Sequence, residues 1–497
     1  MLIQSDKKQI EALGMSEISV QEQLRDFQEG FPSVKLIKPA LLNQGILTFD
    51  QAELTKRIRL YESSLAVKKV VKFVPASGAA TRMFQALFEC LGTTTEGLGL
   101  SSLAVQNKAV QTFFKQLKDF AFYEELEQLL INKGLSVDDP FHILNCLLTA
   151  QGLNYGQLPK GLIKFHREDG ILRTATEEHI VEACAYASSG AGEVYLHFTV
   201  SQEHQEKFEE HVAIIKDTYQ TKYGVKIVIN YSQQQKATDT IAVDLENNPV
   251  RNQQGALLFR PAGHGALLEN LNGIEADLIF IKNIDNVVPD RLKFETIRYK
   301  KLLAGTLLSF QSVAFDLLNI LEQAPTDQQV IEINGWVRDH LGYVSDAPLD
   351  RKQLFEVLNR PMRVCGMVKS EGNPGGGPFW VQNKEARTLQ IVETAQVNFE
   401  QKDQKQIFEV ATHFNPVDIV CGVRNFQGIK FDLIKYRDPS TGFITQKSKD
   451  GKPLKALELP GLWNGAMASW NTIFVEVPLI TFNPVKSIND LLLPEHV

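Results

Sequence analysis

The sequence predicts an α/β protein with a mixed, mostly parallel sheet and helices on both of its faces. Apolar runs with the length of buried strands alternate with segments of helical spacing from Val70 onward. Such alternation is typical of parallel sheets, and their ligands gather at the carboxyl ends of the strands. We therefore expect the functional motifs to lie in loops that directly follow strands.

The composition excludes several classes of protein. The chain has 497 residues, 43% of them apolar, and a formal net charge of −7. Lys and Arg are scattered among Asp and Glu, so we expect no nucleic acid as a partner. The charged N-terminus differs from a signal peptide, and no run of about 18 uncharged apolar residues indicates a membrane span. We expect a cytoplasmic protein without a membrane partner.

The cysteines give no sign of a disulfide framework or a metal site. They are odd in number and far apart, at Cys90, Cys146, Cys184, Cys365 and Cys421. Disulfide-rich folds and zinc sites show even numbers or close pairs of cysteines. We therefore expect reduced thiols, most of them in the core.

Three regions are expected along the chain. Residues 1–66 have helical spacing and predict a helical N-terminal segment. Residues 67–300 predict the α/β core, with a helical insertion at 86–150 and a helix opened by the capping box of Thr174 and Glu177. Residues 301–497 predict an α+β part that completes the functional site.

The first candidate motif is VPASGAATRM at 74–83, a loop of small residues between a buried strand and a helix. Such a loop can place several backbone N–H groups around an anion. A tight turn with small residues for packing is the ordinary alternative.

Two further candidate motifs are RPAGHGALLENL at 260–271 and ADLIFIKNIDN at 276–286. Gly263 and Gly265 flank His264 and allow a backbone approach to a flat base. In the next motif a strand is followed by Asn283 and Asp285, and one carboxylate with phosphate oxygens is a usual way to hold Mg²⁺. A glycine-rich turn and a capping Asp are the ordinary alternatives.

These motifs resemble those of the UDP-sugar pyrophosphorylases. The first loop is similar to the family's A-G-G-x-G-T-R, RPAGHG to its P-P-G-H-G-D, and ADLIFIKNIDN to its I-x-N-x-D-N. Pro159-Lys160 matches a Pro-Lys pair, and VPLITFNPVKSINDLL at 477–492 matches V-P-x-x-R-F-x-P-V-K-x-x-x-D-L-L. Ser77, Ala80 and Thr481 depart from these patterns. As a whole the chain resembles an uncharacterised bacterial family labelled only as a domain of unknown function.

The resemblance implies the nucleotide-diphospho-sugar transferase fold (GT-A, Rossmann-like) and a nucleotidyltransferase. The reaction implied joins UTP and a sugar-1-phosphate to give a UDP-sugar and pyrophosphate. Arg82, Lys160 and Lys486 would neutralise phosphate charge, and Asp285 would bind Mg²⁺. The substrate- and nucleotide-binding residues implied are Ser77, Gly78, Thr81, Gln233, Gly263, His264, Gly265 and Asn283.

Asn464 is a further candidate, for a different reason. It lies in ELPGLWNGAMASWNT, whose Gly, Asn and Trp content is typical of a sugar-binding wall, although a capping or turn role is equally ordinary. Asp418 is a candidate of the same kind.

Two other functions stay open at this point. One is a non-catalytic nucleotide-sugar-binding protein, because of the departures at Ser77, Ala80 and Thr481. The other is a glycosyltransferase of the same fold, although Asp285 lacks the partner of an Asp-x-Asp motif. The sequence ends without the C-terminal β-helix that many relatives append, so we expect a monomer or a small oligomer.

Overall fold

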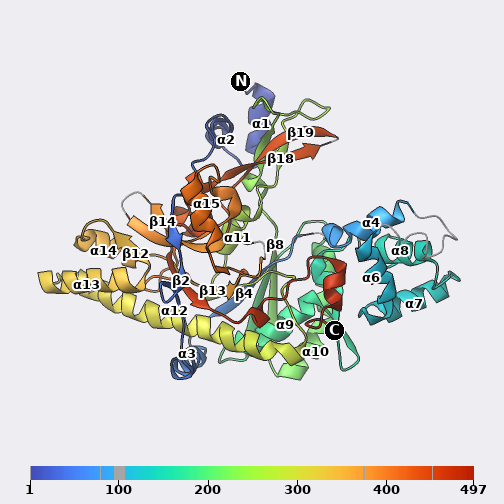
Figure 1. Ribbon diagram of the computed structural model, residues 1–497, viewed down its shortest axis with the longest axis horizontal. Coiled ribbons are helices and arrows are strands. Elements are labelled where there is room, and N and C mark those ends of the chain that lie inside the picture. Colours follow the sequence, from blue (N-terminus) through green and yellow to red (C-terminus); the bar gives the residue numbers. More distant parts are fainter. Residues whose placement is uncertain (1, 79, 94–106, 373–374, 384–385, 450) are drawn as a thin grey trace. The chain divides into compact units, whose positions relative to one another are not determined.

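The computed structural model describes residues 2–78, 80–93, 107–372, 375–383, 386–449 and 451–497 (Figure 1). The described chain divides into two compact units. Unit 1 comprises Met1–Ser64, Gln234–Ile281 and Lys301–Val477, and unit 2 comprises Leu65–Gln233, Lys282–Lys300 and Pro478–Val497. This division differs from the expected boundaries at 66 and 300, because the chain passes between the units several times.

Unit 2 is built on parallel strands. Strand β4 (Val70–Pro75) pairs with β7 (Glu193–Thr199), and β7 pairs with β8 (Lys226–Ser232), all in the parallel sense. Most of β4 is buried, as expected for a strand covered on both faces. Helix α9 (Ala175–Tyr186) packs against β7, and α10 (Gln205–Tyr223) packs against β8. The predicted capping box of Thr174 and Glu177 opens α9.

The expected insertion at 86–150 is helical in its described residues, and residues 94–106 lie outside them. Its helices gather in one cluster (Figure 1). They are α4 (Gln85–Leu91), α6 (Lys108–Lys115), α7 (Tyr123–Asn132) and α8 (Pro140–Leu148). Stacked and edge-on rings of Phe113, Phe120, Phe122 and Tyr155 fill its interior. An antiparallel hairpin of β5 (Lys164–Glu168) and β6 (Ile171–Thr174) precedes α9.

Unit 1 contains a mixed sheet in the order β2-β3-β20-β13-β17-β11. Pairing is parallel from β2 to β13 and antiparallel from β13 through β17 to β11. The strands are β2 (Leu41–Leu42), β3 (Gly45–Leu47), β20 (Asn471–Glu476), β13 (Met362–Lys369), β17 (Ile419–Gly422) and β11 (Leu278–Ile281), with β16 (His413–Phe414) paired to β13. The predicted mixed α/β class with mostly parallel strands is therefore correct.

Two antiparallel sheets complete unit 1. One has the order β1-β14-β15-β12 and the other the order β10-β9-β19-β18. Their strands are β1 (Leu36–Pro39), β14 (Gly377–Asn383), β15 (Ala386–Val392), β12 (Tyr343–Ser345), β10 (Phe259–Arg260), β9 (Thr240–Val243), β19 (Lys452–Glu458) and β18 (Phe443–Lys449). Helices α1 (Gln4–Ala12) and α2 (Glu17–Glu29) bury Ile10, Val20 and Phe27 against Ile241 and Val243 of β9.

The expected helical segment 1–66 is only partly helical. Residues 36–47 form β1, β2 and β3. Strand β1 pairs with β14, and β3 pairs with β20, so their partners lie several hundred positions away. The local spacing of apolar residues does not indicate such distant partners, because strand formation depends on pairing and packing more than on the strand's own sequence.

The remaining helices of unit 1 are α3 (Gln51–Ser64), α11 (Leu267–Asn272), α13 (Asp327–His340), α14 (Arg351–Leu358), α15 (Lys402–Glu409) and most of α12 (Lys293–Glu322). Strand β12 lies between α13 and α14. The stretch Asp290–Glu322 is long and apolar enough to span a membrane by length and composition, and half of its apolar window is buried inside the structure. A buried core helix passes the same test. All five cysteines are free thiols.

The packing of α12 on α3 gives a test of unit 1. A Cβ atom on Gly305 of α12 would lie 1.9 Å from the carbonyl oxygen of Arg57 in α3. We expect Gly305→Ala to lower the free energy of unfolding by about 1–3 kcal/mol, because neither backbone can yield. The control is Gly335→Ala in α13, whose Cβ would meet only Arg338 at 3.9 Å. It should stabilise the protein by about 0.5–1 kcal/mol. Equal effects in urea denaturation would contradict this packing.

Candidate functional site

Three charged side chains from separate motifs meet in unit 2. Lys160 Nζ and Lys486 Nζ each lie 3.0 Å from the same oxygen, Oδ2 of Asp285. The two lysines are 125 and 201 positions away from Asp285 along the chain. Lys160 also donates a hydrogen bond of 2.7 Å to the carbonyl oxygen of Val485, the neighbour of Lys486. One carboxylate thus binds two cations that the sequence keeps far apart.

The carboxylate of Asp285 is almost buried, with 9% of the side chain exposed. Burial alone would raise its pKa, but the charges of Lys160 and Lys486 outweigh burial and hold the pKa below its ordinary value. The other carboxylate oxygen, Oδ1, is buried and has no hydrogen-bond partner among the described residues. A buried ionised oxygen is costly unless a donor or a cation satisfies it. Asp285 therefore offers Oδ1 to a ligand.

The chemistry around Asp285 fits a cation that takes most of its ligands from bound phosphate and water. Within the described ranges, no group of three or more His, Cys, Asp and Glu side chains is placed to hold a metal ion. Mg²⁺ is usually bound in this way, by one or two carboxylates together with substrate phosphates. Oδ1 of Asp285 supplies a hard oxygen donor of this kind, so the residues present fit Mg²⁺.

Backbone hydrogen bonds hold the turn of Asp285 against the segment that carries Lys486. The N–H of Val485 donates to the carbonyl oxygen of Asp285 at 3.0 Å. The side chain of Asn286 accepts from the N–H of Asn483 at 2.9 Å and donates to the carbonyl oxygen of Thr481. The sequence motif contained Asn286, but only the structure reveals that it joins two distant segments.

The first loop adjoins the same cluster. The N–H of Ala80 donates to the carbonyl oxygen of Leu158, two residues before Lys160, at 3.1 Å. The N–H of Ile488, two residues after Lys486, donates to the carbonyl oxygen of Met83 at 3.0 Å. The loop is therefore tied to both lysine motifs.

Within this loop, exposed and buried positions differ in role. Ser77, Gly78, Thr81 and Arg82 are exposed, and Ala79 lies outside the described residues. Ala80, where the pyrophosphorylases have glycine, is fully buried and does not have a positive φ. Its methyl group therefore packs into the core, and its backbone does not need glycine. Thr481, another departure from the motif patterns, is also buried, and its hydroxyl donates to the carbonyl oxygen of Pro478.

The GHG motif lies in unit 1, and its glycines allow close packing. Gly263 has a φ of 75°, and a Cβ there would lie 2.6 Å from Glu458 Oε2. A Cβ on Gly265 would lie 2.3 Å from the carbonyl oxygen of Pro460. The motif therefore needs glycine because it packs against residues 458–460, a reason other than the predicted approach of a base.

His264 and Asn464 belong to this packed region. The ring of His264 stacks on Trp463 with centroids 4.4 Å apart, and its Nδ1 accepts from the N–H of Leu462 at 3.0 Å. Asn464 donates to Gln396 Oε1 at 3.1 Å, while its own Oδ1 is buried without a partner among the described residues.

Glu393 and Trp463 were not among the predicted site residues. Glu393 Oε1 lies 3.7 Å from His264 Nε2, and burial raises the pKa of Glu393. No motif contains Glu393, whereas the Trp- and Asn-rich composition of 459–472 already pointed to the loop of Trp463.

The other predicted residues occupy separate places. Gln233 is exposed just after β8, and its amide donates to Gln205 at 2.9 Å. Asn283 is half-buried, and its carbonyl oxygen accepts from the N–H of Asn286. Asp418 is buried, and its carbonyl oxygen accepts from the N–H of Gly366. None of these contacts involves the Asp285 carboxylate.

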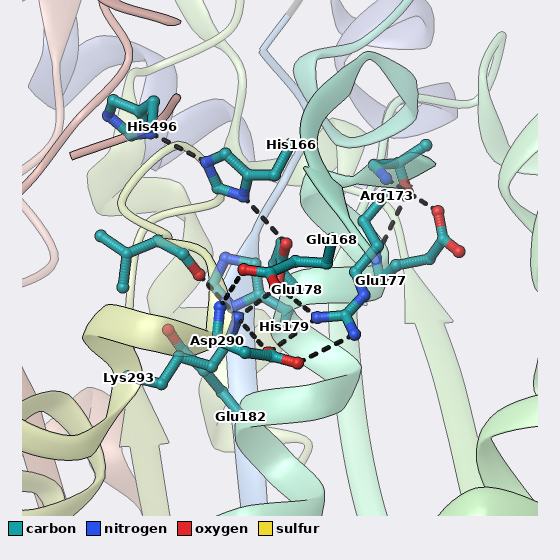
Figure 2. A network of polar contacts seen from close by, with 12 residues as sticks. His166, Glu168, Arg173, Glu177, Glu178, His179, Glu182, Asp290, Lys293 and His496 are labelled. Carbon is teal, nitrogen blue, oxygen red and sulfur yellow. Dashed lines mark hydrogen bonds and ion pairs between the residues drawn. The ribbon is translucent and has the colours of Figure 1, made fainter. Parts of the chain in front are cut away.

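Helix α9 lies in unit 2, as does Asp285, and buried charged side chains surround it (Figure 2). Glu182 accepts from Lys72 at 2.8 Å and from Lys282 at 2.7 Å. Burial lowers the pKa of Lys72 to about 7, while the two lysines hold the pKa of Glu182 well below its ordinary value against the effect of burial. Glu178, one turn earlier, accepts from His166 and from Lys293. The sequence showed no motif at these positions.

The packing of His264 gives a test. Burial lowers its pKa to about 4, and its Nδ1 already accepts a hydrogen bond that protonation would break. Because the pKa in the unfolded chain is about 6.5, the folded protein binds fewer protons between these values. The contribution to the free energy of unfolding is therefore present above pH 6.5 and is lost as the pH falls towards 4.

We expect the His264 resonance in histidine-labelled protein to titrate with a midpoint near 4, and His264→Gln identifies the resonance. A midpoint near 6.5, the value of a solvated imidazole, would show that the ring is not held as described.

Comparisons with known proteins place the chain in a family. A search of curated proteins finds no match. Among solved structures, a mutant UDP-glucose pyrophosphorylase of Leishmania major in complex with UDP-glucose is 13% identical, with 99% of this chain and 79% of that chain covered and a TM-score of 0.43. The UDP-N-acetylglucosamine pyrophosphorylase of Trypanosoma brucei in complex with an inhibitor is 11% identical, with 95% and 74% covered and a TM-score of 0.47. The family model described as "Domain of unknown function (DUF4301)" matches residues 3–497, and the chain therefore belongs to the DUF4301 family.

Proposed function

We propose that this protein is a nucleotidyltransferase that makes a UDP-sugar and pyrophosphate from UTP and a sugar-1-phosphate. The observation that carries the proposal is the arrangement at Asp285, where Lys160 and Lys486 share Oδ2 and the buried Oδ1 has no partner among the described residues. The motifs that contribute these residues are the ones that resemble the pyrophosphorylases. We propose the nucleotide-diphospho-sugar transferase fold on the same ground.

The proposed reaction needs charge neutralisation more than proton transfer. An oxygen of the sugar-1-phosphate attacks the α-phosphorus of UTP, a new P–O bond forms, and the bond to the β-phosphate breaks as pyrophosphate leaves with the electron pair. Nucleophile and leaving group are already anionic, so positioning and electrostatic stabilisation dominate such a reaction. No general base is required.

The residues of unit 2 have distinct roles in this proposal. Asp285 would hold Mg²⁺ through Oδ1, and the ion would supply charge stabilisation on the phosphates. Lys160 and Lys486 would turn part of their hydrogen bonding from Oδ2 to phosphate oxygens, because an ammonium group has three donors. The exposed Arg82 would contact phosphate with its planar fork. The exposed Ser77, Gly78 and Thr81 would add donors from the first loop.

Unit 1 carries further proposed substrate-binding residues, Gly263, His264, Gly265 and Asn464. The buried Oδ1 of Asn464 and the half-exposed stack of His264 on Trp463 are the features that support a role in binding. For Gln233 and Asn283 the proposal rests on the motif resemblance alone. We propose a cytoplasmic setting on the composition alone.

The reaction is tested by measuring pyrophosphate release with Mg²⁺, nucleoside triphosphates and a panel of sugar-1-phosphates. We expect release with UTP and at least one sugar-1-phosphate. Binding of UTP or a UDP-sugar without release would favour a non-catalytic binding protein. Transfer of sugar from a UDP-sugar to an acceptor, without pyrophosphate formation, would favour a glycosyltransferase.

Asp285→Asn tests the metal role. We expect kcat to fall by about 10²–10³-fold, the usual loss when one group that stabilises transition-state charge is removed. Mn²⁺ binding in the presence of UTP, measured by electron paramagnetic resonance, should weaken in parallel. Asp217→Asn on the exposed surface of α10 is the control and should leave both unchanged. Full activity of Asp285→Asn would remove Asp285 from the proposed metal site.

Lys486→Ala tests the phosphate role separately from the fold. Its side chain is 61% exposed, so its removal leaves no large cavity. We expect kcat/KM for UTP to fall by at least about tenfold, since a charge-assisted contact is worth about 1.5–3 kcal/mol. Lys222→Ala, at an exposed position of α10, is the matched control. Equal kinetics for the two variants would contradict a phosphate role for Lys486.

A further inference from the structure

Helix α9 is unusual because four of its ionisable side chains are buried. Glu177, Glu178, His179 and Glu182 are each at most 6% exposed. Charged residues are almost never fully buried unless they are paired, and buried ion pairs contribute little net stability. Their partners therefore indicate what these side chains do (Figure 2).

One contact of α9 reaches the Lys160 motif. Thr176 Oγ1 donates to the carbonyl oxygen of Gly161 at 2.7 Å. Gly161 is packed so closely that a Cβ there would lie 2.7 Å from the ring of Phe208 and 2.9 Å from Thr176 Oγ1. The backbone next to Lys160 is thus held by the hydroxyl of Thr176 on one side and by a ring of α10 on the other.

A second contact reaches the turn of Asp285. His179 Nε2 donates to the carbonyl oxygen of Ile284 at 3.2 Å. Glu182, one turn later on the helix, binds Lys282 at 2.7 Å. The two residues bind the segment just before Asp285 at two points, one at the backbone of Ile284 and the other at the side chain of Lys282, and both are fully buried.

A relay of three side chains links α9 to the segment of Lys486. Glu178 accepts from His166 Nδ1 at 2.9 Å, and His166 Nε2 bonds to His496 Nδ1 at 2.9 Å. The rings of His166 and His496 are nearly parallel, and His496 also bonds to the backbone of Asn483. Figure 2 shows this chain of contacts from Glu178 through His166 to His496.

We infer that α9 is the positioning helix of the candidate site, with Thr176, His179 and Glu178 each fixing one of the segments that carry Lys160, Asp285 and Lys486. The three segments are remote in sequence. Helix α9 contacts the first two directly, at Gly161 beside Lys160 and at Ile284 beside Asp285. It reaches the third through His166 and His496, and His496 bonds to the backbone of Asn483, three residues before Lys486. Thr176, His179 and Glu178 are positioning residues, since they touch neither of the lysine ammonium groups nor the Asp285 carboxylate. The inference rests on the proposed function in so far as it concerns catalysis.

The test compares Thr176→Val and His179→Leu, which remove the donors and keep the volume roughly constant. His179→Gln is the conservative variant, because its amide can still donate to Ile284. Thr306→Val is the control, since this buried hydroxyl donates to the carbonyl oxygen of Leu302 in its own helix. Amide hydrogen exchange is measured on the full chain without ligand, together with the melting temperature.

Local loosening is expected. Thr176→Val should speed exchange in the segment of Lys160 and Ile163, and His179→Leu in the segments of Asn286 and Val485, by about tenfold, as for the loss of one typical hydrogen bond. His179→Gln and Thr306→Val should leave these segments near the wild-type rate. Unchanged exchange, or a uniform increase over all of unit 2, would overturn the inference.

The kinetic arm separates positioning from folding. With UTP and a sugar-1-phosphate that is turned over, the two donor-deleted variants should lower kcat by about 10–100-fold while KM changes little, as for misplaced catalytic groups. Local loosening with unchanged kcat would overturn the role in catalysis. If the wild-type protein releases no pyrophosphate with any substrate, the proposed function fails. The exchange measurement then still decides whether α9 holds the segments of Lys160 and Asp285.

Discussion

The sharing of one buried carboxylate by two lysines is the interaction on which the candidate site depends. Lys160 and Lys486 lie at Oδ2 of Asp285 and hold the pKa of this carboxyl group below its ordinary value despite burial. Removing one partner of a buried pair typically costs about 3–5 kcal/mol, because the remaining charge is left uncompensated. This cost applies to Asp285 and Lys160, since the Lys486 side chain is 61% exposed. The three segments that carry these residues are therefore held to each other by electrostatics, even though they are remote in sequence.

The polar contacts around this cluster explain why so many charges are buried in unit 2. A buried ion pair is weak as a source of stability, but it specifies geometry. Glu182 with its two lysines, and Glu178 with His166, join the side chains of separate segments within the core near the cluster. In unit 1, close packing holds the GHG loop in place. There, Gly263 and Gly265 let the GHG loop pack directly on residues 458–460.

Some parts of the fold could be predicted from the sequence, and others could not. The parallel strands at 70–75, 193–199 and 226–232 and the capping box at Thr174 were predictable, because each rests on a local pattern. The strands between 36 and 47 were not, because they form by pairing with β14 and β20. The expected regions 1–66, 67–300 and 301–497 follow the order of the chain, whereas each of the two units is assembled from three separate stretches of chain.

The sequence by itself determined the chemistry available, namely which motifs carry Arg82, Lys160, Asp285 and Lys486, and the strand and helix pattern that places them in loops. Only the tertiary structure decided that Lys160 and Lys486 meet on a single oxygen of Asp285. It also decided that Ala80 faces the core. The side chains of Thr176, Glu178 and His179 on α9 are likewise buried away from solvent. The physical reason is that burial and pairing depend on segments hundreds of residues apart. The local sequence pattern of one segment does not indicate which distant segment packs against it.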